Sequence, residues 1–436
     1  MYKKMVFLGL VFLVFPTGAS FAQLDQTFDR LFKAFLVTGF QLSPDEHGMH
    51  FIPASEQAIR ELTPALNSLI AGKISSFPLS STITIDYEPG ASGAPVRVFG
   101  SLGPIFAESA KTLGQNRLYV GFNYTYLGLS RYRGLPTEDF RFTFTHEDVG
   151  AQGLGDRTGE SDVVDLYLDL HLDANSYVVF ATYGVTDRFD IGIALPVVNV
   201  NLEGRARGVV QSFTFAIPNQ EPQHQFGDDP LNPVFEKEVA YLEKATGLGD
   251  LALRLKYHAV QSNLLHLAML LDLRLPTGDE RDFLGTGKPT TKISGILSKK
   301  IGGGTTHLNI GYQRRDAELD SDELEVVLGF DQEVFKGFTI AAEFIGDIDL
   351  DADDAISLFP GSIEIVDQPG DGSRSIRRID LSNIPERDND NTFDLALGVR
   401  IAATEQFSLL SSMLVPLNHG GLKSTVTATV GMSVFF

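Results

Sequence analysis

Apolar and polar residues alternate along most of this chain after about residue 116, in segments of about ten residues. Residues 118–126 read L-Y-V-G-F-N-Y-T-Y, and residues 164–172 read V-D-L-Y-L-D-L-H-L. An alternation with a period of two is typical of a β-strand with one apolar and one polar face. Further segments of this kind follow at 177–185, 189–202, 250–260, 265–275, 290–301, 306–315, 323–334, 338–347, 392–403, 407–416 and 425–436. The pattern predicts an all-β protein.

The connections between these segments fall into two sets. Tight turns lie at 186–189, 261–263, 302–304, 335–337 and 404–406, and they alternate with longer loops at 133–161, 203–248, 276–289, 316–321, 348–391 and 417–424. Short turns at one end and long loops at the other are typical of bacterial outer-membrane β-barrels, whose strands of about 10 residues cross the bilayer. We therefore expect a closed transmembrane antiparallel β-barrel over residues 116–436.

The number of wall strands depends on how residues 162–186 fold. If they form one long strand, the wall has twelve strands, with every tight turn at the periplasmic end and every long loop at the exterior end. If 173–176 is a hairpin, the segment 140–146 becomes a strand and the count is fourteen. A hairpin pattern at 82–87 and 96–100 could add two further strands to the wall. We predict twelve strands within a range of 10–16.

The amino-terminal part of the chain has a different pattern. A short basic stretch, an apolar core at 6–15 and small residues before position 23 predict a secretory signal peptide over residues 1–22. Apolar residues at helical spacing then predict two short amphipathic helices within 23–80, with Pro64 interrupting the second. Residues 23–115 are expected to form a helical segment and a hairpin, placed either in the barrel lumen as a plug or on the periplasmic rim.

Composition narrows the class of protein and its partners. The chain has 35 basic and 56 acidic residues, a net charge of −21, which disfavours nucleic acid as a partner. It has no Cys, so neither disulfides nor a lipid-modified cysteine is expected. No apolar stretch after the signal peptide reaches the ~18 residues of a membrane helix. An exported chain of this kind can still span a membrane as a closed barrel.

Assigning the apolar register to lipid predicts which residues line the lumen. A lipid-facing Arg or Lys at the bilayer midplane costs about 2–4 kcal/mol, so charged residues should face inward. The predicted lumen-lining residues are Asp165, Asp169, His171, Arg254, Lys256, His258, His266, Arg274, Lys292, His307, Arg315, Glu325 and Glu343. These charges either stand apart across water and sort polar solutes, or pair directly and fill a narrow barrel.

Few residues suggest metal or catalytic chemistry. Asp349, Asp351 and Asp353 alternate in an acidic run that could ligate calcium, but the run lacks the glycine and closing glutamate of an EF-hand. His47 and His50 offer a weak metal-ligand spacing. No nucleophile signature accompanies the strand histidines. We therefore expect no cofactor, no resident metal and no enzymatic activity.

Three stretches resemble a known family. They are A-T-Y-G-V-T-D-R-F-D-I-G-I-A-L-P at 181–196, L-P-T-G-D at 275–279 with L-G-T-G at 284–287, and the strand that ends in Phe436. They are similar to outer-membrane proteins grouped as the phenol-degradation meta-pathway (MetA-pathway) family. The resemblance covers most of 117–436 and implies a barrel with a role in uptake of aromatic or other hydrophobic compounds. It supplies no catalytic residues.

These observations predict an outer-membrane channel or transporter for passive uptake of small molecules. The alternatives are a structural or surface-adhesion barrel with acidic extracellular loops, and a barrel-embedded hydrolase. The expected partners are outer-membrane lipid and lipopolysaccharide, the solute, and the bacterial barrel-assembly machinery. That machinery would read the terminal strand through Phe436, Val434 and Met432, which we expect to face lipid.

Overall fold

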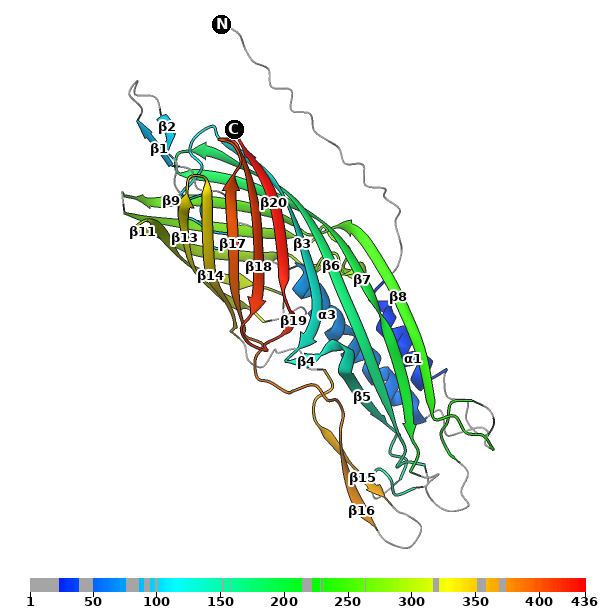
Figure 1. Ribbon diagram of the computed structural model, residues 1–436. Coiled ribbons are helices and arrows are strands. Elements are labelled where there is room, and N and C mark those ends of the chain that lie inside the picture. Colours follow the sequence, from blue (N-terminus) through cyan, green and yellow to red (C-terminus); the bar gives the residue numbers. More distant parts are fainter. Residues whose placement is uncertain are drawn as a thin grey trace.

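The computed structural model describes most of the chain. The described residues are 23–38, 50–75, 101–150, 153–157, 159–213, 222–227, 229, 231–262, 264–316, 321–350, 358–367 and 374–436, with the backbone of two short strands at 86–89 and 95–98. The predicted signal peptide at 1–22 lies outside them. A barrel occupies one end of the elongated molecule, and helices with an extension of the barrel strands occupy the other (Figure 1).

Twelve antiparallel strands form the closed wall. In order around the barrel they are β3 (Leu118–Tyr132), β20 (Thr427–Phe435), β18 (Phe407–Pro416), β17 (Thr392–Ala402), β14 (Phe338–Asp349), β13 (Glu323–Phe335), β12 (Gly304–Arg314), β11 (Thr290–Ile301), β10 (Leu265–Leu275), β9 (Leu251–Gln261), β7 (Phe189–Gln211) and β6 (Val163–Thr186). The ring closes because β3 pairs with β20 on one side and with β6 on the other. The predicted count of twelve is confirmed.

Strands β6 and β7 are about twice as long as the other wall strands. Strand β6 runs through 173–176 without a hairpin. Beyond the wall, β5 (Phe140–Thr145) pairs with β6, and β8 (Glu236–Leu248) pairs with β7. We call the four-stranded sheet made by β5, β8 and the outer parts of β6 and β7 the overhang. Much of the predicted loop 203–248 is therefore strand, and the segment 140–146 is a strand that does not enter the wall.

The remaining strands are short. β4 (Leu135–Pro136) and β19 (Leu422–Ser424) both extend the sheet beside β3. β15 (Ser362–Asp367) pairs with β16 (Ser375–Asp380) within the loop between β14 and β17. β1 (Asp86–Pro89) and β2 (Pro95–Val98) form the predicted hairpin as a separate two-stranded sheet, so they add no wall strands. Two 3₁₀ turns, η3 (Thr137–Asp139) and η4 (Glu280–Asp282), complete the elements.

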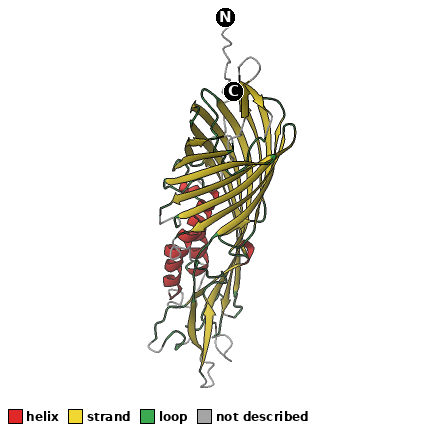
Figure 2. Cartoon of the chain, turned by 90° about the vertical axis from the view of Figure 1, so that its left-hand side faces the viewer, coloured by secondary structure: helices red, strands yellow, loops and turns green. Residues whose placement is uncertain are grey.

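The helices pack against the overhang at the long-loop end of the molecule. They are α1 (Gln26–Leu36), α2 (Ile52–Gln57), the π-helical segment η2 (Ala58–Leu62) and α3 (Thr63–Ser75), and we call them together the cap. Proline 64 does not end the second helix: its missing N–H falls directly after η2, where the wider π turn replaces the usual bonding pattern. Figure 2 shows the cap beside the strands at the end away from the carboxy-terminus.

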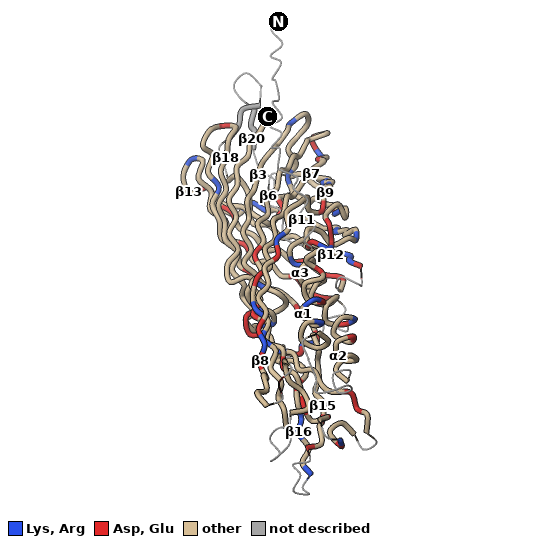
Figure 3. The backbone as a smooth tube through the Cα atoms, turned by 90° about the vertical axis from the view of Figure 1, so that its right-hand side faces the viewer, with Lys and Arg blue, Asp and Glu red and all other residues tan. Residues whose placement is uncertain are grey.

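One large apolar core joins the cap to the overhang. Phe28, Phe32 and Phe35 of α1 are fully buried together with apolar residues of β5, β6, β7 and β8. Figure 3 shows charged positions along β8 and the cap helices. The overhang and cap thus form a small globular layer with its own core.

The barrel wall exposes an apolar belt on its outer face. Large apolar side chains point outward from successive strands at about half exposure, as in Val179, Ile193, Met269, Ile293, Ile310, Leu328, Ile340, Leu397, Met413, Val430 and Met432. Such a belt around a closed barrel is expected in contact with lipid. Among the described residues, no helix has the length and hydropathy needed to cross a bilayer. The molecule is an outer-membrane β-barrel.

The orientation predicted for the outer part of β6 is wrong. Leu166, Leu168, Leu170 and Leu172 are buried against the cap rather than turned to lipid. The alternate residues therefore lie on the opposite, outer face of the overhang. Asp169 and His171 are exposed there, and Asp165 is buried between Thr143 and Gln211. The reason is that this part of the strand extends past the membrane, so water instead of lipid surrounds its outer face.

Candidate functional site: the barrel interior

An irregular segment crosses the barrel interior near the short-turn end. We call this segment, residues 101–115, the strap. It has no regular secondary structure, and its residues 102–110 are all buried. Its backbone N–H groups donate to side chains that project inward from the wall: Leu102 to Thr339 Oγ1 at 2.9 Å, Ala110 to Ser298 Oγ at 2.8 Å and Leu113 to Asp190 Oδ2 at 2.9 Å.

Glutamate 343 is the central acceptor for the strap. Its carboxylate accepts three consecutive backbone N–H groups, from Ile105, from Phe106 at 2.8 Å and from Ala107 at 2.9 Å. Hydrogen bonds from three donors satisfy a carboxylate that is only 1% exposed. Glycine 329 allows the close approach, since an added Cβ there would lie 2.9 Å from the Ala107 Cβ. The wall sequence is therefore shaped to hold this segment.

Glutamate 108 fastens the middle of the strap by charge. Its carboxylate lies 2.8 Å from Arg254 Nη2 and 2.7 Å from Lys256 Nζ, and all three side chains are largely buried. Arg254 Nε also lies 3.3 Å from Asp272 Oδ2. Removal of one member of a buried ion pair usually costs about 3–5 kcal/mol because the partner charge is left buried. This cluster is the strongest polar anchor of the strap.

A Ser-His-Asp hydrogen-bonded chain lies beside the strap. Ser298 Oγ lies 2.8 Å from His307 Nδ1, and His307 Nε2 lies 2.6 Å from Asp331 Oδ1. The three side chains, on β11, β12 and β13, are at most 3% exposed. Because the Asp331 carboxylate accepts from His307 Nε2, Nδ1 of the neutral ring accepts the Ser298 hydroxyl, and Ser298 Oγ in turn accepts the Ala110 N–H. In this conformation the three hydrogen-bonded side chains anchor the strap.

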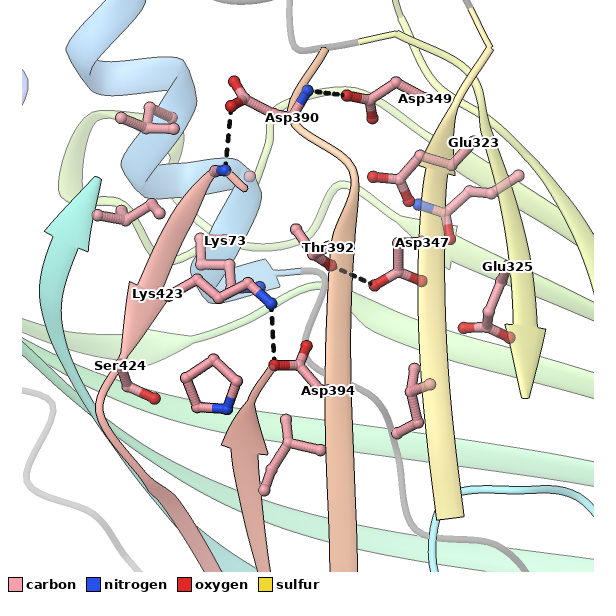
Figure 4. Close-up of a pocket in the computed structure, with 18 of the residues that line it drawn as sticks. Lys73, Glu323, Glu325, Asp347, Asp349, Asp390, Thr392, Asp394, Lys423 and Ser424 are labelled. Atoms are coloured by element: carbon pink, nitrogen blue, oxygen red, sulfur yellow. Dashed lines mark hydrogen bonds and ion pairs between the residues drawn. The ribbon is translucent and has the colours of Figure 1, made fainter. Parts of the chain in front are cut away.

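A cavity, which we call the vestibule, opens at the long-loop end. Its empty space is about 1200 Å³, part of it open solvent, between α3, the outer ends of β11–β14, and the segments around residues 390–394 and 421–427. Its charged residues pair directly: Lys292 with Glu325 at 2.9 Å, Arg315 with Glu323 at 2.6 Å, and Lys423 with Asp394 at 2.9 Å. Figure 4 shows Lys423 turned toward Asp394, and the Asp347 carboxylate accepting the Thr392 hydroxyl. Of the two arrangements left open by the sequence, direct pairing is observed.

A second cavity, the inner chamber, continues from the vestibule to the strap. Lys292, Glu325 and Ile345 line both cavities. The inner chamber has about 500 Å³ of empty volume, and Phe106 and Glu108 of the strap contribute to its lining. Charged residues and the apolar side chains Leu270, Ile296 and Val327 share the rest of its wall. Together these two adjoining cavities span the barrel interior from the loop end to the strap, and we call them the path.

The structure places the remaining predicted lumen residues in the barrel interior. Arg254, Lys256, Glu343 and His307 contact or neighbour the strap, and Arg274, Lys292, Arg315 and Glu325 line the cavities. His258 and His266 lie side by side, with 3.1 Å between His258 Nε2 and His266 Nδ1. The sequence did not predict the strap, because most of its hydrogen bonds to the wall are donated by backbone N–H groups and it has no periodic pattern.

The predicted calcium ligands are only partly within the described residues. Asp351 and Asp353 lie outside them, and Asp349 accepts the backbone N–H of Asp390 at 2.7 Å. In the described part of the chain, no three acidic, histidine or cysteine side chains converge as metal ligands. At the carboxy-terminus, Met432 and Phe436 are about half exposed on the outer face, the orientation expected for an assembly signal.

The loop 276–289 attaches the cap to the barrel. Asp250 accepts the backbone N–H groups of Gly278 at 3.0 Å and Thr286 at 2.9 Å, and the Asp25 N–H at the start of α1 donates to Arg281 O at 2.9 Å. Burial raises the pKa of Asp25 and Asp282 above the usual range of an aspartate. The segments 275–279 and 284–287, which together carry part of the family resemblance, therefore belong to this attachment loop.

Comparison with known proteins found one family model and several solved structures similar to this chain. Residues 151–354 match the family model described as "Putative MetA-pathway of phenol degradation". Similar solved structures include an outer-membrane channel from Pseudomonas putida F1, with 13% identity, a TM-score of 0.40, and coverage of 75% of this chain and 98% of that one. A FadL homologue from Pseudomonas aeruginosa has 9% identity, a TM-score of 0.34, and coverage of 74% and 90%. The toluene transporter TbuX from Ralstonia pickettii has 10% identity, a TM-score of 0.27, and the same coverage of 74% and 90%.

Likenesses of this strength carry no argument about function, and no curated protein sequence matches the chain. The family match agrees with the resemblance seen in the sequence at 181–196 and 275–287. The chain is thus a twelve-stranded outer-membrane β-barrel protein whose residues 151–354 match the MetA-pathway family of phenol degradation.

Proposed function

We propose that the protein is a passive outer-membrane channel for small molecules and that the strap closes it in the conformation described. The observation that carries this proposal is the path from the vestibule through the inner chamber to Phe106 and Glu108. A barrel with only a structural role could fill its interior with wall side chains. Here the wall leaves two adjoining cavities and supplies specific acceptors for a separate segment, which supports the proposal of a closing strap.

The lining of the path suggests the class of solute. One part of the inner chamber is charged and another is apolar, so it suits a small molecule with an apolar body and a polar substituent. The family resemblance implies aromatic or hydrophobic compounds, and an aromatic compound with a polar group satisfies both requirements. We therefore propose small amphipathic molecules, including substituted aromatics, as the transported solutes.

The test is single-channel conductance of the Glu108→Ala variant in planar bilayers. The substitution leaves Arg254 and Lys256 buried without their shared carboxylate, at a cost of about 3–5 kcal/mol to the closed arrangement. We expect longer or larger openings than in the unaltered protein. Glu238→Ala, which removes an exposed carboxylate of the overhang near Arg205, is the matched control and should not change conductance.

A second strap variant makes the test decisive. Residues 104–110 are replaced by a Gly-Ser segment of equal length, which removes the apolar side chains and Glu108 while keeping the chain connected. If this variant assembles as a barrel and never conducts, the protein is not a channel. A structural or adhesion barrel predicts that result.

The hydrolase alternative rests on the Ser298–His307–Asp331 chain. A hydrolase predicts that a serine-reactive probe labels Ser298 once the strap is loosened in Glu108→Ala. We expect no labelling of Ser298 in this variant. Labelling that is lost in a Ser298→Ala double variant would favour the hydrolase.

A further inference from the structure

A third cavity, which we call the side pocket, lies in the barrel interior beside the path. It has about 610 Å³ of empty space, part of it open solvent. Its lining comes from the last turn of α3, from β3, β6, β7, β9 and β10, and from the attachment loop 276–289. Of the described lining residues, Arg274 alone is shared with the inner chamber, so this residue stands at the junction of the two cavities.

Two buried apolar clusters form the walls of the side pocket. Val178, Ala194 and Ala252 belong to a small cluster on β6, β7 and β9. Ile74 of α3 and Leu284 of the attachment loop belong to the large core that joins the cap to the overhang. The side pocket lies where the two clusters meet, so the apolar body of a ligand in it would contact both.

The polar groups of the side pocket stand on opposite sides of these walls. In the order of strands around the barrel, β7 and β9 separate β6 from β10. The hydroxyl groups of Thr125 on β3 and Ser176 on β6 therefore line one side, and Arg274 on β10 lines the other. Strands β6 and β10 are three strand spacings apart, at most about 15 Å. An apolar body between the two sides can thus be little larger than one aromatic ring.

Two charged residues are among the described residues that line the side pocket, and they hold different groups. The Asp250 carboxylate accepts the N–H groups of Gly278 and Thr286 and the Thr286 hydroxyl, all on the attachment loop. Arg274 Nη1 donates to the backbone carbonyl of Ser75 at the end of α3. A guanidinium carries five N–H donors in a planar fork, and it can bind a carboxylate while it also donates to a carbonyl. Arg274 thus places a carboxylate-binding group at the junction.

We propose that the side pocket binds a small carboxylic acid with an apolar body. Arg274 binds the carboxylate, because arginine matches its geometry through two parallel N–H···O bonds. The body lies on the apolar walls, between α3 on one side and β7 and β9 on the other. This inference narrows the solute class of the channel and rests on the proposed function for transport, whereas binding itself does not require the channel to open.

The experiment is isothermal titration calorimetry of the full-length exported protein in a maltoside detergent, with benzoate as the probe. We expect saturable binding of one benzoate per chain. Benzyl alcohol keeps the ring but has no charge, and should bind at least about tenfold more weakly, because a charge-assisted hydrogen bond is stronger than a neutral one. Acetate has no apolar body and should show no saturation at concentrations that saturate benzoate binding.

Variants test the two parts of the site separately. Arg274→Gln should weaken benzoate binding about 10- to 100-fold, as expected for loss of hydrogen bonds from a charged group. Ala194→Leu fills space beneath the apolar body and should weaken binding while Arg274 is kept. Arg205→Gln and Ala240→Leu, both on the exposed outer face of the overhang, are the matched controls and should bind as the unaltered protein does. Limited proteolysis of the cap checks that α3 stays docked, since Arg274 also holds its end.

Three results overturn the proposal. They are the lack of saturable benzoate binding by the unaltered protein, an equal affinity for benzyl alcohol, and an affinity for benzoate that is unchanged in both Arg274→Gln and Ala194→Leu. Failure of the proposed channel would be seen differently, as a strap variant that never conducts although the protein still binds benzoate.

Discussion

Strand β6 has two halves that lie in different surroundings while sharing one continuous register. In the wall half, odd-numbered residues such as Val179 and Tyr183 face outward and are about half exposed to the surroundings of the barrel. In the overhang half, even-numbered residues such as Leu168 and Leu170 face inward and are buried by the cap. Even-numbered side chains point inward along the whole strand. The apolar residues, however, are the odd-numbered ones in the wall half and the even-numbered ones in the overhang half.

The change follows from the medium on each side of the sheet. Around the wall, lipid lies outside, and inside lie charged side chains that pair with one another or bind the strap, so the outward residues are apolar. Around the overhang, water lies outside and helices lie inside, so the inward residues are apolar. Strand β7 repeats the change: Ile193 is exposed in the wall half, whereas Val200 and Leu202 are buried in the overhang half. The point in a strand at which the apolar residues change from the outward to the inward positions thus marks where the strand leaves the membrane.

The largest expected effect comes from Leu168→Ala. This side chain is 0% exposed in the core shared with α1, and loss of a buried leucine costs about 2–5 kcal/mol because a cavity remains. We expect the cap to become sensitive to limited proteolysis while the barrel stays folded. Val179→Ala, in the wall half, should leave the cap protected. Equal cap cleavage in both variants would contradict a separate overhang core.

A charge placed on the outer face should distinguish the two halves almost as strongly. Val179→Arg puts a cation against lipid and should cost about 2–4 kcal/mol of barrel stability. Asp169→Arg puts the same side chain on the same face of the strand but in water, and should change stability by no more than about 0.5 kcal/mol. The measurement is the urea midpoint of refolded protein in lipid vesicles. Equal losses would place residue 169 inside the membrane.

The smallest effect concerns pH and the attachment loop. Burial raises the pKa of Asp25 and Asp282 when the loop and α1 are docked. A raised pKa means that the docked form holds protons more tightly, so its stability is greatest below pH about 4 and falls as pH rises through the raised values. Cap proteolysis should therefore be slightly slower at pH 5 than at pH 7.5.

A single substitution checks the origin of this pH effect. Asp282→Asn keeps an acceptor for the backbone N–H groups of Gln23 and Leu24, just before α1, and should reduce the difference between the two pH values. Glu238→Asn, on the exposed outer part of β8, should leave the difference unchanged. A larger pH difference in Asp282→Asn would show that the sign of the effect is wrong.

Much of the wall could be predicted from the sequence because each strand carries its own pattern. The alternation at 250–260 and 265–275, for example, set both the strands and the inward positions of Arg254 and Arg274. The same reasoning failed for Asp165, Asp169 and His171, because it assumed lipid outside every strand. The meeting of Ile74, Ala194 and Arg274 around the side pocket was out of reach, since these residues are far apart in the sequence.

The sequence by itself determined the strand count, the turns and the two faces of each strand, because alternation and turn residues are local properties. Only the tertiary structure decided which face meets lipid, water or helix, since that depends on what lies next to the strand. It also decided the role of residues 101–115, whose backbone N–H groups are satisfied by Glu343, Ser298 and Asp190 on distant strands. A backbone donor is present at nearly every residue, so only the assembled barrel shows which donors find an acceptor.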